Sequence, residues 1–278
     1  FDILTDNSVE VDGRIVHFYR YLAAMATDPI VLVPRASVTA LPDVGFNDAT
    51  WHEVPRHGVH SGVLTNLLFL LRFQTGRARA ARFWDAFLCE PFQAPGLSLP
   101  SPSDPCSDEP DLRKRCGCNG CHAGLEPAAA YWARFTDAGT LYLNPFLFPL
   151  VIDECATCAN EPAGCDSVCR HFYLTEAGHP DMIPYLGTLH TFVFRDEAEV
   201  ASAAEGPTGL VATYLANGKL PQCTTMKLFE RFFGRPMSVA ERQDVLPGLL
   251  DAFEASGHDF ITLVKAIVMT DGYRRMTR

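Results

Sequence analysis

The sequence contains no apolar stretch long enough to cross a bilayer. The longest candidate covers residues 63–71, and Thr65 and Asn66 interrupt it, whereas a transmembrane helix needs about 20 apolar residues. Positive charge is also scarce, since 23 Lys and Arg oppose 33 Asp and Glu and leave a formal net charge of −10. We therefore expect a protein that does not itself span the membrane and that does not bind nucleic acid.

Other familiar signals are missing as well. The sequence shows no Ser-His-Asp set and no pair of carboxylates spaced for acid–base chemistry. The chain begins at Phe1, without a Met or a signal peptide. We therefore expect a mature or trimmed form with sequence missing upstream.

Cysteine, by contrast, is abundant, with ten residues in a chain of 278. Cys118 and Cys121 are separated by two residues, and His122 follows directly. This spacing is typical of c-type haem attachment, in which the two thiols form thioethers with the haem vinyl groups and the imidazole ligates the iron. The sequence therefore predicts one covalent haem c held by Cys118, Cys121 and His122, with His122 as the metal ligand.

Two other interpretations fit the same residues. A zinc site could combine thiolates, including that of Cys116, with one imidazole. However, the adjacent Cys121 and His122 do not easily reach one tetrahedral ion together with Cys118. In the other interpretation the cysteines form disulfides and His122 is simply exposed.

The other eight cysteines form an even set, which is typical of a disulfide-rich protein from an oxidising compartment. Since covalent haem attachment also takes place outside the cytoplasm, we expect a periplasmic or extracellular protein. Proximity favours a Cys106–Cys116 disulfide, and we expect Cys89–Cys223 to join the haem module to the last domain. The remaining four favour two short-range disulfides, with a four-thiolate metal site as the alternative: Cys155, Cys158, Cys165 and Cys169.

Apolar periodicity predicts a mainly α fold. It indicates a short helix at 16–25, a β-leaning segment at 30–33, two helices within 59–90, a helix at 127–135 and four C-terminal helices. A capping box at Ser238 and Glu241 begins the third of these four. The expected organisation is the tail of a preceding domain or a wrapping segment (1–58), a haem c module (59–143), an irregular cysteine-rich insertion (144–190) and a C-terminal helical domain (191–278).

Haem iron also needs a partner on its second face, where Met raises the potential, His lowers it and an open position admits small ligands. Met182 lies between Pro180 and Pro184, an arrangement similar to the ligand loop of small class I cytochromes c. We therefore take Met182 as the candidate second metal ligand. Five histidines compete with it: His57, His60, His171, His179 and His190.

Four arginines precede the motif and form a local basic cluster in an acidic protein. Arg forks suit carboxylates, so this cluster could neutralise haem propionates; a solvated helix face is the alternative. The cluster comprises Arg72, Arg77, Arg79 and Arg82.

Several short motifs occur in an order that resembles one family. Around the haem motif they are 62–65, the arginine-rich helix ending at Cys89, the proline-rich loop, Glu126-Pro127, Phe135 and Gly139; downstream they are Cys223, 233–235, 256–260 and 270–274. This order resembles the planctomycete-type cytochrome c family of multidomain exported proteins, which is also abundant in myxobacteria. The resemblance covers about residues 56–142 and 186–276.

The resemblance implies an exported protein with a cytochrome-c-like haem module, and no more, because the family has no established activity. The chain departs from the family where Ala133 and Thr136 replace acidic residues, and where residues of about 144–185 form an insertion. We expect electron transfer with other redox proteins or haem subunits as partners. The alternatives are a haem subunit of a larger extracellular or membrane-associated assembly and a peroxidase-type haem enzyme with an open distal site.

Overall fold

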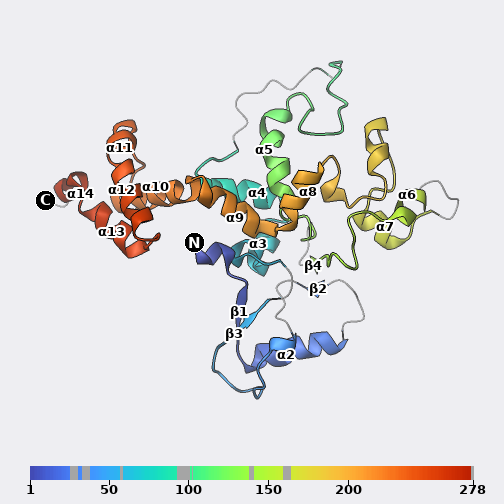
Figure 1. Ribbon diagram of the computed structural model, residues 1–278, viewed down its shortest axis with the longest axis horizontal. Helices are drawn as coiled ribbons and strands as arrows, with labels where there is room; N and C mark the ends of the chain where they lie inside the picture. Colours follow the sequence, from blue (N-terminus) through green and yellow to red (C-terminus); the bar gives the residue numbers. More distant parts are fainter. Residues whose placement is uncertain are drawn as a thin grey trace. The chain divides into compact units, whose positions relative to one another are not determined.

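The computed structural model describes residues 1–25, 31–32, 38–56, 59–92, 101, 103–137, 141–158 and 164–276. Helices dominate this part of the chain (Figure 1), which confirms the mainly α prediction. The strands that it contains are short and form two antiparallel pairs. Among the described residues no helix has the length and apolar character to cross a membrane.

The chain divides into two compact units. The larger unit comprises Asp2–Arg82 and Phe92–Leu210, and the C-terminal unit comprises Phe1, Phe83–Pro91 and Val211–Arg278. These boundaries differ from the four ranges expected from the sequence. The segment Phe83–Pro91 groups with the C-terminal helices, and residues 191–210 group with the larger unit.

The larger unit begins with α1 (Asp2–Thr5) and a small α/β element. In this element β1 (Ser8–Val11) pairs antiparallel with β3 (His52–Pro55), with Val9 opposite Val54. Helix α2 (Gly13–Met25), expected at 16–25, contributes Val16 to the same small core. The short elements β2 (Val31–Leu32), which pairs with β4 (Leu141–Tyr142), and η1 (Val38–Ala40) complete this part.

The predicted helices in 59–90 are present as four shorter elements. These are η2 (Gly62–Thr65), α3 (Leu67–Arg72), α4 (Gly76–Phe83) and the single π turn η3 (Trp84–Leu88). Asn66 caps α3 by accepting a hydrogen bond from the backbone N–H of Leu68. Arg79, on α4, is fully buried and points its guanidinium at the backbone of the segment that follows the haem motif.

The helix expected at 127–135 begins eight residues earlier. Helix α5 spans Asn119–Ala130, with Pro127 inside it, and Phe135 lies beyond its end in a β-bridge with Tyr142. Proline is most favourable in the first turn of a helix, but here tertiary contacts outweigh that preference. Trp132, just after α5, is buried and donates its indole N–H to the carbonyl oxygen of Leu64.

Two disulfides organise the cysteine-rich region. Cys155 in α6 (Asp153–Thr157) pairs with Cys169 in α7 (Ser167–Phe172), and Cys158 pairs with Cys165. These cysteines pack with aromatic residues such as Tyr173 into one hydrophobic core. The 3-10 turns η5 (Pro180–Tyr185) and η6 (His190–Phe192) follow, and then α8 (Glu197–Ala204).

The four predicted C-terminal helices are present as six. Helix α9 (Gly206–Ala216) crosses the boundary between the units, and five helices follow: α10 (Lys219–Phe233), α11 (Val239–Asp244), α12 (Leu246–Ala255), α13 (Phe260–Val268) and α14 (Asp271–Met276). The capping box at Ser238 and Glu241 is confirmed. The predicted third helix is divided into α11 and α12, because Pro247 lies in the first turn of α12 and cannot continue α11, and α14 is the other additional helix.

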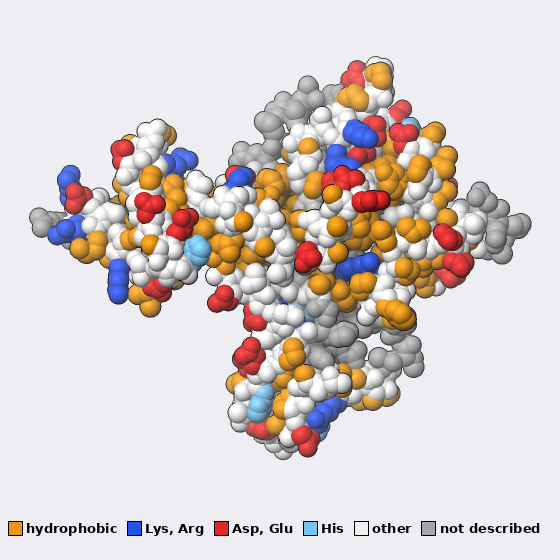
Figure 2. Space-filling model, viewed as in Figure 1, with side chains coloured by type: hydrophobic (Ala, Val, Ile, Leu, Met, Phe, Trp, Pro, Cys, Tyr) orange, Lys and Arg blue, Asp and Glu red, His pale blue; other side chains and the backbone are white. Residues whose placement is uncertain are grey.

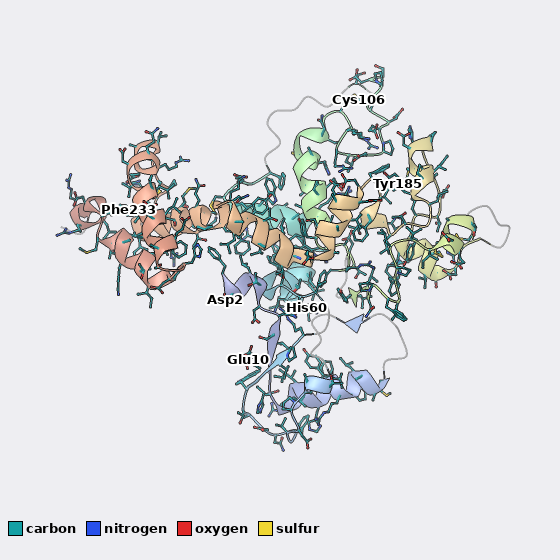
Figure 3. All side chains as sticks on the ribbon, viewed as in Figure 1. Asp2, Glu10, His60, Cys106, Tyr185 and Phe233 are labelled. Atoms are coloured by element: carbon teal, nitrogen blue, oxygen red, sulfur yellow. A yellow bond between two sulfur atoms is a disulfide. The ribbon has the colours of Figure 1, made fainter. Side chains whose placement is uncertain are left out.

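The core of the C-terminal unit is aromatic. Phe229, Phe233 and Phe253 pack with Leu263 and Ile267 from α13, and Phe233, labelled in Figure 3, stacks on Phe229 with ring centroids 3.8 Å apart. The predicted Cys89–Cys223 disulfide is confirmed. Both cysteines belong to the C-terminal unit, so the bridge lies within one compact unit and does not join two.

Candidate cofactor site

The haem-type motif lies at the start of α5. Cys118 is the residue before the helix, and Cys121 and His122 follow in its first turn. Residues three and four positions apart share one helix face, so both thiols and the imidazole project from the same side of α5. All three side chains are partly exposed, and a cofactor could therefore reach them from solvent.

The disulfides separate these two thiols from the others. The structure pairs eight of the ten cysteines, and the two that remain are Cys118 and Cys121. The predicted Cys106–Cys116 bridge is confirmed and lies on the loop that leads into α5, where Figure 3 labels Cys106. Because Cys116 is in a disulfide, it cannot serve as a third thiolate for zinc.

The disulfide pairing also decides between the two interpretations of the cysteines in residues 155–169, two short-range disulfides or a four-thiolate metal site. Its four thiols form the disulfides Cys155–Cys169 and Cys158–Cys165, as the favoured interpretation expected. Across the described residues, no three His, Cys, Asp or Glu side chains converge as a metal-binding group would. A four-thiolate metal site is therefore not what these cysteines form.

His122 is held by a carboxylate one helical turn further along α5. Its Nδ1 lies 2.7 Å from Oε1 of Glu126. A carboxylate accepts, so the proton resides on Nδ1 and Nε2 remains for a metal ion. Metal-ligating histidines commonly have this carboxylate partner, which orients the ring and increases its basicity.

Glu126 is itself embedded between two arginines. Arg77 from α4 donates Nε to Oε1 at 2.5 Å, and Arg195 donates Nη2 to Oε2 at 3.1 Å. The Glu126 and Arg195 side chains are only 8% and 5% exposed. Burial acts to raise the pKa of Glu126, but hydrogen bonds from Arg77 and His122, with the charges of Arg77 and Arg195, hold this pKa below its ordinary value. Glu126 is therefore ionised at neutral pH.

A cavity of about 340 Å³ lies against this cluster, within the usual size range for small-molecule sites. Glu126, Arg77 and Arg195 line it on one side, together with Trp132. Met182 and His190 also line it, so the structure brings the candidate second ligand to the cavity that Glu126 borders. Cys118, Cys121 and His122 are not among its lining residues, and Glu126 is their link to it.

Met182 is carried by a rigid turn. Pro180 begins η5 and Pro184 lies within it, while the His179 imidazole accepts a hydrogen bond from the backbone N–H of Asp181. Tyr185 closes the turn and is labelled in Figure 3. The turn therefore holds Met182 beside the cavity with little conformational freedom.

The competing histidines have other surroundings. His60 is buried against the rings of Phe135 and Tyr142, and His179 caps η5 as described. His171 lies on the ring of Phe172. Of the described histidines, His190 lines the cavity. Burial and then the neighbouring charge of His171 lower the pKa of His190. His57 lies outside the described residues.

The predicted arginine cluster does not act as one group. Arg77 alone of the four lines the cavity. Arg79 donates hydrogen bonds to three backbone carbonyl oxygens, those of Phe73, Phe135 and Thr136. Arg72 and Arg82 both lie over the ring of Phe73.

Arg195 is the site residue that the sequence did not indicate. It stands alone after Phe194, without a motif, and reaches Glu126 only through the fold. The Nε of Arg195 is buried and makes no hydrogen bond within the described residues, so this group is a candidate donor to a molecule bound in the cavity. Glu126 could have been found, since it follows His122 by four positions, which is the spacing of a helical contact.

The residues present fit a covalent haem. The thiols of Cys118 and Cys121, which are in no disulfide, share a helix face with the His122 imidazole, and Glu126 accepts a hydrogen bond from Nδ1 of this ring. Arg195, whose buried Nε makes no hydrogen bond within the described residues, lines the adjacent cavity. Figure 2 shows basic and acidic side chains close together on the surface of the larger unit, where Arg113 forms an ion pair with Glu199 of α8. Comparisons with models of protein families, with curated proteins and with solved structures found nothing that matches this chain.

Proposed function

We propose that this chain is a monohaem c-type cytochrome domain protein that transfers electrons in an exported redox system. The observation that carries the proposal is the sorting of the cysteines. Of ten, the only two left outside disulfides are those of the Cys-x2-Cys-His motif, and the histidine of that motif already has an ordered carboxylate partner. When bound, haem c supplies a one-electron Fe(III)/Fe(II) couple.

Each residue of the site has a distinct role in this proposal. Cys118 and Cys121 would hold the haem covalently and His122 would ligate its iron. Glu126 keeps the proton of His122 on Nδ1, and so presents Nε2 to the iron. Met182, on its proline-braced turn, would be the second ligand.

The arginines offer the counter-charge that haem propionates need. Arg77 is half exposed and Arg195 is buried, and both border the cavity. The buried Nε of Arg195 suits a carboxylate oxygen. This assigns the neutralising role to Arg77 and Arg195 in place of the cluster around Arg79.

The cellular setting follows from the disulfides and from the family resemblance. Four disulfides persist only where thiols are not kept reduced, and covalent haem attachment is also an extracytoplasmic process. We therefore propose a periplasmic or extracellular location. Its partners would be other redox proteins or haem subunits.

A peroxidase-type enzyme is the second candidate, and one observation favours it. A carboxylate on Nδ1 makes imidazole a stronger donor, which favours chemistry at an open iron over a high potential. The polar residues His190 and Thr191 line the same cavity. The two functions differ in whether Met182 occupies the second axial position.

The proposal is tested by expressing the chain in a host that exports it and attaches haem c. The pyridine haemochrome spectrum of the purified protein should show a c-type band, and haem should remain on the denatured chain. The double variant Cys118→Ser/Cys121→Ser should lose that haem. The matched control Cys106→Ser/Cys116→Ser, which removes a neighbouring disulfide, should keep it.

The spectrum of the ferric protein then separates the two functions. A low-spin, six-coordinate spectrum supports electron transfer, and a high-spin spectrum supports the enzyme. If the wild-type chain carries no covalent haem in a host that loads other c-type cytochromes, the proposal is wrong.

A further inference from the structure

We propose that Glu126 is a positioning residue that lowers the reduction potential of the iron through His122, and that Arg77 and Arg195 limit the size of this effect. The inference rests on the proposed function, because it concerns the iron that His122 would ligate. It goes further by assigning a role to three residues outside the attachment motif. Two of them, Arg77 and Arg195, come from other segments of the larger unit.

The first step is the geometry of the pair. His122 and Glu126 lie four residues apart in α5, with 2.7 Å between Nδ1 and Oε1. The imidazole is 23% exposed and the carboxylate 8%. The carboxylate end of the contact is thus shielded from water. A charge-assisted hydrogen bond is stronger in such surroundings than in contact with solvent.

The second step is that the carboxylate cannot turn away. Oε1 accepts from Nε of Arg77 as well as from His122, and Oε2 accepts from Nη2 of both Arg77 and Arg195, at 3.3 and 3.1 Å. Arg195 also donates to the backbone carbonyl oxygen of Glu126. Both oxygens are therefore committed, and the orientation of the His122 ring is determined by groups on three different segments.

The third step concerns charge. A carboxylate on Nδ1 shifts the imidazole toward imidazolate, and a stronger donor stabilises Fe(III) more than Fe(II), which lowers the potential. Two guanidinium groups on the same carboxylate withdraw negative charge from it. The reduction potential therefore depends on the balance between one anion, Glu126, and two cations, Arg77 and Arg195. Removal of the anion should raise the potential, and removal of a cation should lower it.

The fourth step is that the balance is adjustable from the surface. The Arg77 side chain is 53% exposed, whereas that of Arg195 is 5% exposed. Arg77 can therefore be changed with little disturbance of the core. This makes it the better of the two arginines for an experiment.

The test is a potentiometric titration of the full-length, haem-loaded chain and its variants. Glu126→Gln keeps an acceptor near Nδ1 but removes the charge, and should favour Fe(II) by about ten-fold, which is about 59 mV upward for one electron. Arg77→Gln should shift the potential downward. Glu126→Asp, which restores the charge, should return the potential toward that of the wild type.

Glu199→Gln is the matched control. Glu199 lies on α8 and pairs with Arg113. This variant therefore also removes a partly buried negative charge from an ion pair, but from a different pair than that of His122 and Glu126. Its potential should move much less than that of Glu126→Gln. The NMR signal of the His122 Nδ1–H proton in the Fe(II) protein should shift in the Glu126 and Arg77 variants and stay in place in this control.

The inference is overturned if Glu126→Gln shifts the potential no further than Glu199→Gln, or if the Glu126→Gln and Arg77→Gln shifts have the same sign. Equal signs would mean that both substitutions merely loosen the same cluster. Failure of the proposed function gives a different result, since the wild-type chain would then show no c-type haemochrome. That outcome would overturn both proposals and would be seen before any titration.

Discussion

Glu126 accepts a hydrogen bond from Nδ1 of His122 across one turn of α5, at 2.7 Å. The same carboxylate forms ion pairs with Arg77 and Arg195. The first contact is encoded locally, by a spacing of four residues in one helix. The other two bring α4 and the segment after η6 to the same point. The haem-type motif is thus tied to the rest of the larger unit through its histidine.

The position of Met182 leads to a prediction about the second iron ligand. In the haem-loaded protein, Met182→Leu should remove the charge-transfer absorption that marks a Met–Fe(III) bond and should lower the potential, because thioether ligation raises it. His190→Gln is the control, since His190 lines the same cavity. The measurement is the visible spectrum of the ferric protein; a Met–iron band that survives in Met182→Leu would show that another ligand serves.

The Cys155–Cys169 disulfide should stabilise the segment that carries Met182. Two β-bridges, Val151 with Thr188 and Tyr173 with Leu189, join the disulfide-bonded helices to the chain around η5. Removal of a disulfide that closes a loop of this length costs about 3 kcal/mol in the free energy of unfolding. We therefore expect Cys155→Ala/Cys169→Ala to melt at a lower temperature and to weaken Met182 ligation.

The second disulfide of the region supplies the comparison. Cys158 and Cys165 are 7 residues apart, against 14 for Cys155 and Cys169, and a shorter loop stabilises less. Calorimetry of both double variants should show the larger loss for Cys155→Ala/Cys169→Ala. A larger loss from the shorter loop would contradict the expectation.

Arg79 should be essential for the stability of the larger unit. Its guanidinium is fully buried and donates to the carbonyl oxygens of Phe73, Phe135 and Thr136, each at 2.9 Å. Burial lowers the pKa of Arg79 to about 10, so the group stays charged at neutral pH. Arg79→Met would remove the donor from one buried and two partly buried carbonyl oxygens, at a cost of about 3 kcal/mol or more.

The exposed Arg82 on the same helix is the control for this substitution. Arg82→Met, which removes an exposed guanidinium from over the ring of Phe73, should cost no more than about 1 kcal/mol. Thermal unfolding of the two variants, followed by far-ultraviolet circular dichroism, makes the comparison. Similar melting temperatures for the Arg79 and Arg82 variants would refute the role assigned to Arg79.

The capping box before α11 predicts a pH dependence in the C-terminal unit. Hydrogen bonds from Arg235, and then those from Ser238, lower the pKa of Glu241 from 4.5 to about 2. A lowered pKa in the folded state means that ionised Glu241 stabilises the fold fully above pH 4.5, and that this contribution is lost as the pH falls toward 2. Ser238→Ala should cost about 1 kcal/mol at neutral pH.

The measurement is the unfolding of wild type and Glu241→Gln between pH 7 and pH 2. The difference between them should be largest at neutral pH and should disappear near pH 2. Glu254→Gln, at an exposed acid on α12, should behave like the wild type throughout. A constant difference across the range would show that Glu241 acts through something other than its charge.

Local patterns were the most informative part of the sequence. The capping box at Ser238 and the Cys106–Cys116 disulfide, whose cysteines are 10 residues apart, are confirmed. The Cys89–Cys223 disulfide is also confirmed, but it joins positions 134 residues apart. The prediction that a helix begins at residue 127 is wrong, since α5 begins at Asn119 and Pro127 lies inside it. A proline removes one backbone hydrogen bond, and burial of the residues around it compensates.

The sequence by itself determined the Cys-x2-Cys-His motif, the helical periodicity and the helix caps, because each depends on residues within about one turn of each other. The contact of His122 with Glu126 is also local, but it was missed because the helix was expected to begin only at residue 127. Only the tertiary structure decided that Arg195 meets that carboxylate, that Arg79 is used up by backbone carbonyls and that Met182 borders the cavity. These contacts join segments far apart in the chain, and they follow from how the helices and the disulfide-bonded turns pack, which no local spacing encodes.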